Sequence, residues 1–466
     1  MPFSYVDLLG MKPTEMLDAP IADTPAAIKT LLDSATTAEP LALAGMRHSQ
    51  GGHTAATNGR MVITETMGKV LSVDACNQTV TVQGGATWSQ VHHALRAYGL
   101  APLVHQSSAH FSVGGSIAVN CHGRDLVSGP LANTVVSLKV LTGTGDTLTA
   151  SRTENEQLFQ ATIGGYGACG AILKATLKVT PNLMMQRIWT PMKLGKYAKH
   201  LGELLAGTYP TTLMHHGWIN VSKGGYFSEV ISYDVKREDP PLGDTWAVDN
   251  QLQAEGWGNN EILRAGWAAA RRNGDIRSEV WKHLSDRGQR GTPSQSRLNW
   301  LREDISFTMS AKTDLGVDML QEYFVPLDQF KSFVEALATI FPYVHPPGGQ
   351  TAQLLSSTVR LVMPEQAPVS YLSYAVGSPR VAVAIDAYVP LTAKGEPTCE
   401  AAKQFRRAIS LAWSKGGSYY LPYYSFACPE EHFQPAYPQH GDWKSAALRY
   451  NPKRKFWNNF LAKYGV

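Results

Sequence analysis

Long hydrophobic runs, paired cysteines and blocks of like charge are absent from this chain of 466 residues. No stretch approaches 18 uninterrupted apolar residues, so the sequence predicts no membrane-spanning helix. The five cysteines are scattered, without a Cys-x-x-Cys pair, and no signal-like segment opens the chain; we therefore expect a cytoplasmic location. A formal net charge of +4 without a basic block does not favour a nucleic acid or an anionic membrane as partner.

Motifs of several enzyme classes are missing as well. The sequence has no His-Glu-x-x-His and no paired cysteine ligands, so we expect no metal site. It has no Gly-x-Ser-x-Gly elbow and no P-loop, which disfavours hydrolases and nucleoside triphosphatases. A Rossmann unit is also disfavoured: the stretch GGYGACG is interpreted as lacking the G-x-G-x-x-G spacing and falls late in its domain, and no strand-then-helix unit with a following acidic residue is apparent.

Short alternating strands are frequent in the first 185 residues. A helix is predicted from the Thr24 cap and Pro25, and a second over 87–100 is closed by Gly99. Alternating β-branched runs predict strands, which lie at 40–45, 61–65, 70–85, 135–150 and 170–182.

Strand-then-helix units follow from about residue 186, at 187–210 and 318–341, with further strands at 226–235, 358–364 and 381–389. The Arg- and Trp-rich stretch 258–304 is interpreted as helices with a solvated basic face. The aromatic tail fits no single helix and is expected to return to an earlier domain. We predict an α+β fold that divides into residues 1–185, 186–415 and 416–466.

Glycine-rich stretches recur in the N-terminal half, as AGMRHSQGGHT (44–54), HFSVGGSIAVNCHGRD (110–125) and TIGGYGACGAI (162–172). Glycine lets backbone N–H groups approach a phosphate, because it has no Cβ and tolerates positive φ. One such turn is weak support, since tight turns use glycine for geometric reasons alone. Three of them indicate an extended cofactor that carries phosphate.

These stretches, together with VQGGATWSQVHHAL, VVSLKVLTGTGD, ENEQLFQ and the terminal RYNPKRKFWNNF, occur in an order that resembles the PCMH-type FAD-binding domain of the vanillyl-alcohol oxidase superfamily. That superfamily includes gulonolactone oxidase, alditol oxidase, cytokinin dehydrogenase and decaprenylphosphoryl ribose oxidase. The resemblance is strong over about 30–180 and moderate over the last ~50 residues. It implies two α/β subdomains around FAD, an α+β cap built on an antiparallel sheet, and a C-terminal segment that returns to the flavin domain.

The resemblance also implies the cofactor-binding residues. His48 occupies the place of the histidine that is linked to the flavin 8α-methyl carbon in many members, whereas His53 is expected to be a turn residue that hydrogen-bonds locally. Ser108 occupies the place of a second, cysteinyl link, so double attachment is not expected. The residues expected to contact FAD are Gly45, Met46, Arg47, His48, Ser49 and Gln50 in the first turn, Ser108, Gly114, Gly115, Ser116, Ala118 and His122 around the second, and Gly165, Gly167, Gly170 and Ile172 in the third.

Four residues are candidates for the chemistry. Tyr420 matches a tyrosine of related C-terminal segments, and Tyr423 replaces the lysine of the ribose oxidase. Arg360 resembles the arginine of an E-x-R pattern whose glutamate is Thr358 here. His122 either orders its turn or lies near flavin and substrate. A tyrosine or a histidine would accept the substrate proton, and a phenol would need a cationic neighbour such as Arg360.

The resemblance implies an enzyme in which a small molecule gives a hydride, from carbon next to oxygen or nitrogen, to flavin N5. Gly114 and Gly115 leave little bulk beside the flavin, which favours an oxidase that uses dioxygen. Three alternatives remain open: a dehydrogenase with another acceptor, an epimerase subunit similar to the ribose oxidase, and a non-catalytic ligand-binding protein on the same fold. The sequence gives neither the substrate nor the oligomeric state.

Overall fold

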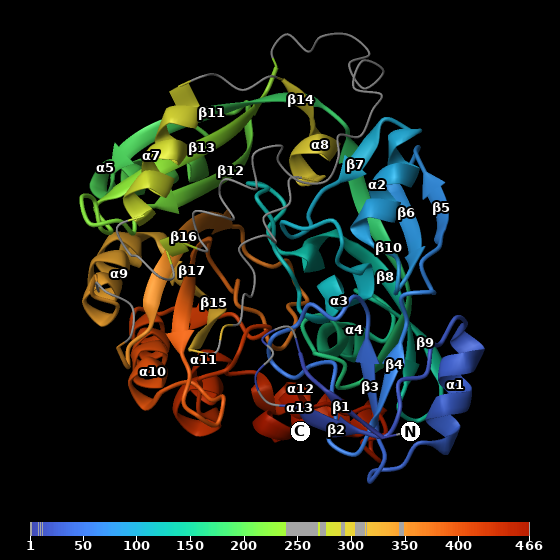
Figure 1. Ribbon diagram of the computed structural model, residues 1–466. Helices are drawn as coiled ribbons and strands as arrows, with labels where there is room; N and C mark the ends of the chain where they lie inside the picture. Colours follow the sequence, from blue (N-terminus) through green and yellow to red (C-terminus); the bar gives the residue numbers. More distant parts are fainter. Residues whose placement is uncertain are drawn as a thin grey trace.

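The computed structural model describes residues 2–465, without residues 8, 10, 12, 239–268, 271–275, 290–293, 303–312, 314 and 344–348. Two regions lie side by side, one made of the N-terminal strands and one built on a large second sheet (Figure 1). Both combine helices with mainly antiparallel sheets, which confirms the α+β fold. Within the described residues, no helix combines the length and the apolar character needed to cross a membrane.

The N-terminal region contains two sheets of different size. The small one pairs β3 (Leu41–Ala44) in parallel with β4 (Arg60–Ile63), and α1 (Pro25–Ser34) belongs to the same apolar cluster. The larger sheet is antiparallel, and its buried side chains pack with α2 (Trp88–Arg96), α3 (Val113–Ala118) and α4 (Glu156–Thr162). Its strands are β5 (Val70–Asp74), β6 (Thr79–Gln83), β10 (Gly170–Pro181), β8 (Val135–Thr142) and β9 (Thr147–Ser151), with β7 (Leu100–Pro102) paired to β10.

The predicted start of the first helix and end of the second are confirmed. The Thr24 side chain accepts a hydrogen bond from the backbone N–H of Ala27, and Pro25 is the first helical residue of α1. Thr87 and Gln90 form a reciprocal capping box at the start of α2. Gly99, just after this helix, has the left-handed φ of +63° that glycine accommodates best.

The second region is built on one antiparallel sheet of eight strands, in the order β14-β11-β13-β12-β16-β17-β15-β18. Helices α5 (Leu194–Leu205), α9 (Leu327–Ile340) and α10 (Cys399–Ser414) cover its outer face (Figure 1). The strands are β11 (Met184–Lys193), β12 (Thr212–Ile219), β13 (Glu229–Arg237), β14 (Gln295–Ser296), β15 (Gly316–Pro326), β16 (Gln353–Val362), β17 (Arg380–Pro390) and β18 (Ser418–Tyr419).

Alternation along β15 decides which side chains face the N-terminal region. Met319, Tyr323 and Val325 pack with the outer helices, whereas Leu320 and Glu322 line a cavity on the opposite face. The inner face is therefore the surface that this sheet contributes to a site between the two regions.

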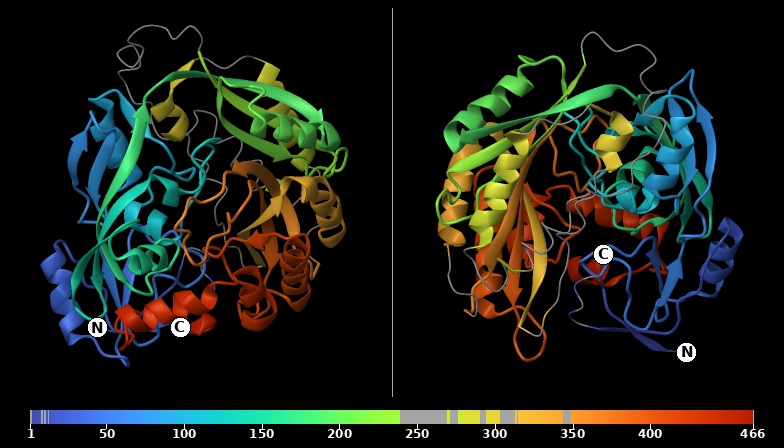
Figure 2. Two further views of the ribbon diagram at one scale, coloured as in Figure 1. Left: turned by 180° about the vertical axis from the view of Figure 1, so that it is seen from behind. Right: turned by 45° about the horizontal axis from the view of Figure 1, so that its top comes forward.

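The C-terminal segment returns to the N-terminal region, as Figure 2 shows for the red helices beside the blue strands. Leu41 of β3 exchanges backbone hydrogen bonds with Lys455 and Trp457, and the Asn458 side chain donates to the Tyr166 carbonyl. The helices of this segment are α11 (Gln434–Ala436), α12 (His440–Tyr450) and α13 (Asn459–Tyr464), after a π-helical turn at Pro429–Phe433. At the other end of the chain, β1 (Phe3–Tyr5) pairs with β2 (Thr14–Met16).

The Arg- and Trp-rich stretch contains α7 (Ile276–Gln289) and α8 (Arg297–Arg302), and part of it lies outside the described residues. The expected solvated basic face is wrong for two of its arginines. Arg277 is buried and donates to the Leu354 carbonyl, and Arg297 forms a buried ion pair with Asp125 at 2.7 Å. Both arginines are held by oxygen acceptors of the protein, which outweighs the preference of a guanidinium for water.

Candidate functional site

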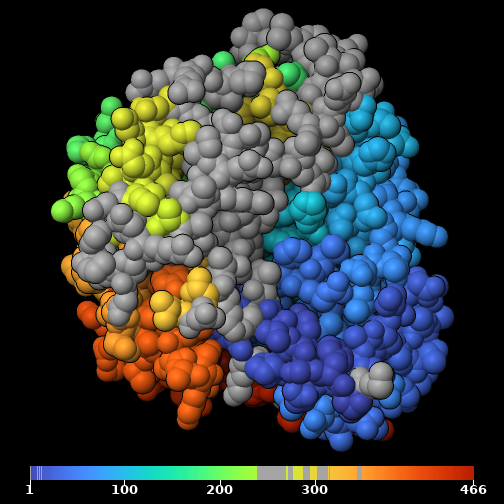
Figure 3. Space-filling model, in the orientation of Figure 1, coloured from blue at the N-terminus to red at the C-terminus, as the bar shows by residue number. Residues whose placement is uncertain are grey.

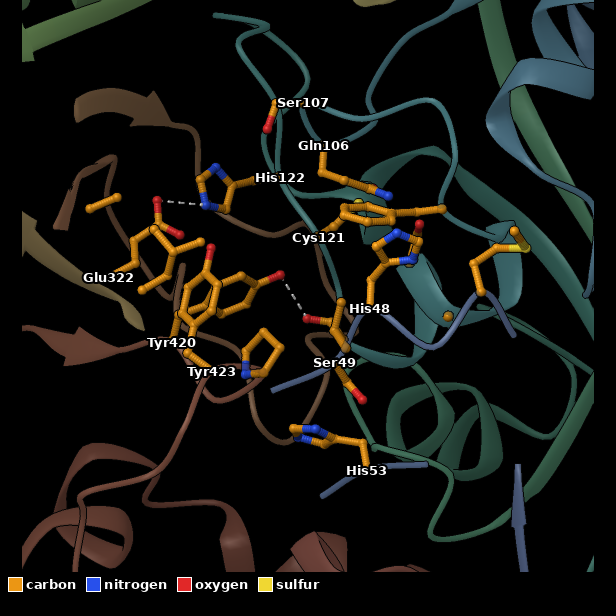
Figure 4. A pocket seen from close by; sticks show the side chains of 18 of the residues that line it. His48, Ser49, His53, Gln106, Ser107, Cys121, His122, Glu322, Tyr420 and Tyr423 are labelled. Atoms are coloured by element: carbon orange, nitrogen blue, oxygen red, sulfur yellow. Dashed lines mark hydrogen bonds and ion pairs between the residues drawn. The ribbon is translucent and has the colours of Figure 1, made fainter. Parts of the chain in front are cut away.

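A cavity of about 260 Å³ lies between the N-terminal region and the inner face of the eight-stranded sheet. Figure 3 shows the blue surface of the first region next to the orange surface of the second. Figure 4 shows side chains of both regions converging on this cavity. The N-terminal wall is formed by Leu43, Gly45–Ser49, His53, Thr54, Gln106, Ser107, Phe111, Ser112, Gly115, Ser116, Val119, Cys121 and His122, and the opposite wall includes Trp218, Leu320, Glu322, Ser356, Thr358, Arg360, Ala384, Asp386, Tyr420 and Tyr423.

The first predicted turn lines the cavity from Gly45 to Ser49, directly after β3. Arg47 has a positive φ of 56°, and its side chain forms an ion pair with Glu65 at 3.2 Å. A Cβ on Gly45 would lie 2.3 Å from Ser112 Oγ, so only glycine lets this turn approach the start of α3 so closely. Gln50 is buried but does not line the cavity.

The two histidines of this stretch have different surroundings. The His48 ring lies at the cavity with its centroid 4.7 Å from that of Phe111, in an edge-on arrangement. The His53 ring stacks on Phe460 of the C-terminal segment at 4.6 Å and lies 5.2 Å from the Tyr166 ring. The expectation that His53 serves only its own turn is therefore wrong, because its contacts are with residues far away in the sequence. Burial lowers the pKa of His53 to about 3.

The second predicted turn becomes the N-terminus of α3. Ser112 caps this helix by accepting from the Gly115 N–H at 3.3 Å. Gly115 and Ser116 line the cavity, whereas Ser108 and Ala118 do not. Gly114 does not line it either, because a Cβ there would lie 2.7 Å from the Gly84 carbonyl oxygen. Gly114 therefore lacks a side chain because the backbone of Gly84 packs against it, and not because a ligand needs the space.

The third predicted turn lies behind the cavity. Gly165, Gly167, Gly170 and Ile172 do not line it. Their stretch does contain a G-x-G-x-x-G spacing, from Gly165 to Gly170, but it leads from α4 into β10. This order is the reverse of the strand-then-helix order of a dinucleotide-binding Rossmann turn. A Cβ on Gly165 would lie 1.8 Å from the Ala161 carbonyl oxygen, so close packing requires this glycine.

A buried contact between a histidine and a carboxylate joins the two regions at the cavity. His122 Nε2 lies 3.1 Å from Glu322 Oε1, and both side chains are almost completely buried (Figure 4). Burial acts to raise the pKa of Glu322, but the interactions with His122 and Arg360 outweigh it and hold this pKa below the usual value. Glu322 was missed in the sequence. Its signal is a carboxylate within the apolar strand run DMLQEYFV, where a buried charge needs a partner.

The other three catalytic candidates also line the cavity. Arg360 donates from Nη2 to Ser107 Oγ at 3.4 Å, and Tyr420 donates from its hydroxyl to the Val119 carbonyl at 3.1 Å. Burial raises the pKa of both Tyr420 and Tyr423, and the proximity of Arg360 to Tyr423 does not offset it. The expectation that a tyrosine accepts the proton is therefore disfavoured, since both phenols hold their protons more tightly than in water.

Comparison with known proteins identifies one part of the chain. Residues 21–151 match the family model of an FAD binding domain. That stretch contains both turns that line the cavity. This part of the chain is an FAD-binding domain of the kind found in FAD-linked oxidases.

Relatives of the FAD-binding domain carry two kinds of name. The chain is 33% identical over 221 residues to the L-gulonolactone oxidase of Bos taurus, which covers 45% of this chain and 49% of that protein. It is 32% identical over 150 residues to cytokinin dehydrogenase 9 of Oryza sativa subsp. japonica, over 32% of this chain and 29% of that protein. The matched stretch thus spans about half the length of these relatives, or less.

The residues around the cavity fit FAD as the cofactor of this domain. Several buried side-chain atoms at the cavity have no hydrogen-bond partner within the described part of the protein, and four of them are Arg47 Nη1, Ser49 Oγ, Gln106 Oε1 and His122 Nδ1. Buried polar atoms are rarely left without a hydrogen bond, so we expect these four atoms to bond to a polar ligand that enters the cavity. They include donors and acceptors from both turns, as a large polar cofactor requires.

Proposed function

We propose that this protein is an FAD-dependent oxidoreductase that removes a hydride and a proton from a small molecule with a CH–OH or CH–NH group. The observation that carries the proposal is the buried His122–Glu322 pair, which joins His122 of the FAD-binding domain to Glu322 of the eight-stranded sheet at the cavity between them. When bound, FAD accepts the hydride at its N5 atom and supplies the redox chemistry. The chain must then bind the substrate, exclude water and take the proton.

We assign proton acceptance to His122, with Glu322 orienting it. If Nε2 carries the ring proton and donates it to Glu322, Nδ1 presents its lone pair, and this atom has no partner within the described residues. The lowered pKa of Glu322 keeps the carboxylate ionised, so that it stabilises the imidazolium formed when Nδ1 takes the substrate proton. In this scheme Tyr420 and Tyr423 remain neutral and shape the cavity.

The wall opposite the FAD-binding domain favours a hydroxylated substrate. Besides Glu322 and Arg360, it carries the hydroxyl and carboxylate side chains of Ser356, Thr358 and Asp386. A site with several hydrogen-bonding groups rejects an apolar ligand, because such a ligand would leave them unpaired. This lining favours a hydroxylated substrate, of the kind in the name of gulonolactone oxidase, over an apolar one.

Two finer features belong to the same proposal. His48 lies at the cavity, where it would form the covalent link to the flavin. The position of the second, cysteinyl link is occupied by Ser108, so His48 would be the single point of attachment. Dioxygen would re-oxidise the flavin beside Gly115, because a Cβ there would meet only Ser112 Oγ, at 3.0 Å. Gly114 no longer supports this oxidase assignment, since it packs against Gly84.

Purified full-length protein, reconstituted with FAD, tests the proposal when it is mixed with a panel of soluble sugars, alcohols and amines. We expect dioxygen uptake that matches substrate loss, with hydrogen peroxide as the other product. Flavin reduction without dioxygen uptake would show that the protein is a dehydrogenase that uses another electron acceptor, and not an oxidase. Protein that shows no flavin absorbance after reconstitution would contradict the enzyme assignment altogether and leave a ligand-binding protein.

A further inference from the structure

The outer face of the eight-stranded sheet carries a buried cluster of metal-binding side chains that the proposed reaction does not use. His215 on β12 and Asp234 on β13 are direct cross-strand partners, and His200 reaches them from α5. His200, His215 and Asp234 are between 0% and 7% exposed. One ligand atom from each lies within 4.8 Å of the others.

We propose that His200, His215 and Asp234 bind a divalent transition-metal cation of the Zn²⁺ type. Two imidazoles and a carboxylate are a donor set that suits Zn²⁺ and its first-row neighbours. No local motif announces this set in the sequence, because the three residues are spread over three elements. The site is independent of the flavin reaction and lies on the opposite face of the sheet from the cavity.

The distances within the cluster are close to those of a coordination sphere. His215 Nδ1 lies 2.8 Å from Asp234 Oδ1, and His200 Nε2 lies 2.9 Å from Oδ2 and 3.2 Å from Oδ1. Donor atoms around a tetrahedral Zn²⁺ are about 3.4 Å apart, as follows from bonds of about 2.1 Å. The side chains would have to separate by roughly half an ångström to reach this spacing. Each of the three side chains offers one ligand atom.

A second observation lies outside the three ligands. The Tyr197 hydroxyl is 2.8 Å from His215 Nε2, and a Glu203 carboxylate oxygen is 3.9 Å from His200 Nδ1. Each histidine therefore has an oxygen facing its outer ring nitrogen, as metal-bound histidines usually do. Glu203 is itself held by a hydrogen bond from the Tyr209 hydroxyl.

Hydrogen bonding without a metal requires a charged His200. A neutral His200 that donates from Nε2 to Asp234 would present its Nδ1 lone pair toward the Glu203 carboxylate, 3.9 Å away. A cation at the centre moves both ring protons to the outer nitrogens, where they meet the Tyr197 and Glu203 oxygens.

The described residues contain one other group of this kind, Cys428, Glu431 and His432. His432 Nδ1 already accepts a hydrogen bond from the Cys428 backbone N–H, and Glu431 is largely exposed. This second group supplies a control, because its histidine nitrogen is already engaged and its glutamate is exposed.

The test is the metal content of the full-length protein, prepared without a histidine tag from cells grown with added Zn²⁺ and passed over a chelating resin. Inductively coupled plasma mass spectrometry should find about one equivalent of Zn²⁺ per chain. Asp234→Asn should remove it, and Glu203→Gln or Tyr197→Phe should weaken Zn²⁺ binding by about 10- to 100-fold, as expected for outer partners. His432→Gln should retain the full equivalent.

Two results would overturn the proposal: wild-type protein that holds normal FAD yet less than a tenth of an equivalent of metal, or metal lost in His432→Gln but kept in Asp234→Asn. If Asp234→Asn does not fold, X-ray absorption of the wild-type protein replaces it. Two imidazole nitrogens with carboxylate oxygen around the metal would support the site, and sulfur would contradict it. Flavin content is measured separately, so a failure of the proposed oxidoreductase would not affect this result.

Discussion

The two walls of the cavity are assembled in different ways. The wall of the FAD-binding domain comes mainly from two short segments, 45–49 and 106–122, each of which carries a glycine turn. The opposite wall takes single side chains from several strands of one sheet, among them Glu322 from β15 and Arg360 from β16. The first wall therefore has a local sequence pattern, whereas the second exists only once distant strands are paired.

The largest expected effect concerns the FAD-binding wall. His48→Ala should remove all flavin fluorescence from the protein band of a denaturing gel, because the covalent link is lost. His53→Gln, five residues on, should keep it, since the His53 ring stacks on Phe460 and only borders the cavity. A fluorescent His48→Ala band would contradict the attachment, and a dark wild-type band would show that FAD is held without a covalent link.

The next largest effect concerns the sheet wall. Glu322→Gln should lower the rate of flavin reduction by roughly 10²- to 10⁴-fold, the usual contribution of acid–base catalysis, because the amide cannot stabilise a charged His122. Anaerobic stopped-flow absorbance measures this rate. Glu229→Gln changes a partly exposed carboxylate of the same sheet that does not line the cavity and should leave the rate unchanged. Equal rates in Glu322→Gln and wild-type protein would exclude this pair as the proton acceptor.

A smaller effect is expected for His53, which should influence the pH dependence of folding stability and not the flavin reaction. Its folded-state pKa of about 3 lies below the unfolded value of 6.5, so the unfolded chain takes up the proton first as the pH falls. Stability is then lost between pH 6.5 and about 3, by about 1.4 kcal/mol per pH unit, or about 2 kcal/mol at pH 5.

Urea unfolding of wild-type and His53→Gln protein at pH 7 and pH 5 measures this difference. The variant should lack the His53 contribution, and His93→Gln, at an exposed position of α2, should behave as the wild type does. The same pH dependence in His53→Gln would place the acid sensitivity elsewhere.

The smallest effect is predicted for Tyr423→Phe. Since burial keeps the phenol neutral, its hydroxyl takes no part in proton transfer, and flavin reduction should slow by less than about tenfold. A loss as large as that of Glu322→Gln would return the proton acceptor to a tyrosine.

The sequence predicted much of the fold and one wall of the cavity. The Thr24 cap and the predicted strands depend on local chemistry and were confirmed, and the first two glycine turns lie at the cavity. Glu322 and the roles of Gly114 and Gly165 could not be foreseen, because they depend on which distant backbone or side chain packs against them. Stacking of His53 on Phe460 likewise depends on the return of the C-terminal segment.

The most direct test of the account is a single turnover of full-length protein, mixed without dioxygen with a substrate found in the uptake screen. The account predicts that the visible flavin absorbance disappears at a rate that Glu322→Gln slows at least a hundredfold and Tyr423→Phe changes by less than tenfold. Substrate consumption while the flavin stays oxidised, or equal slowing in both variants, would contradict it.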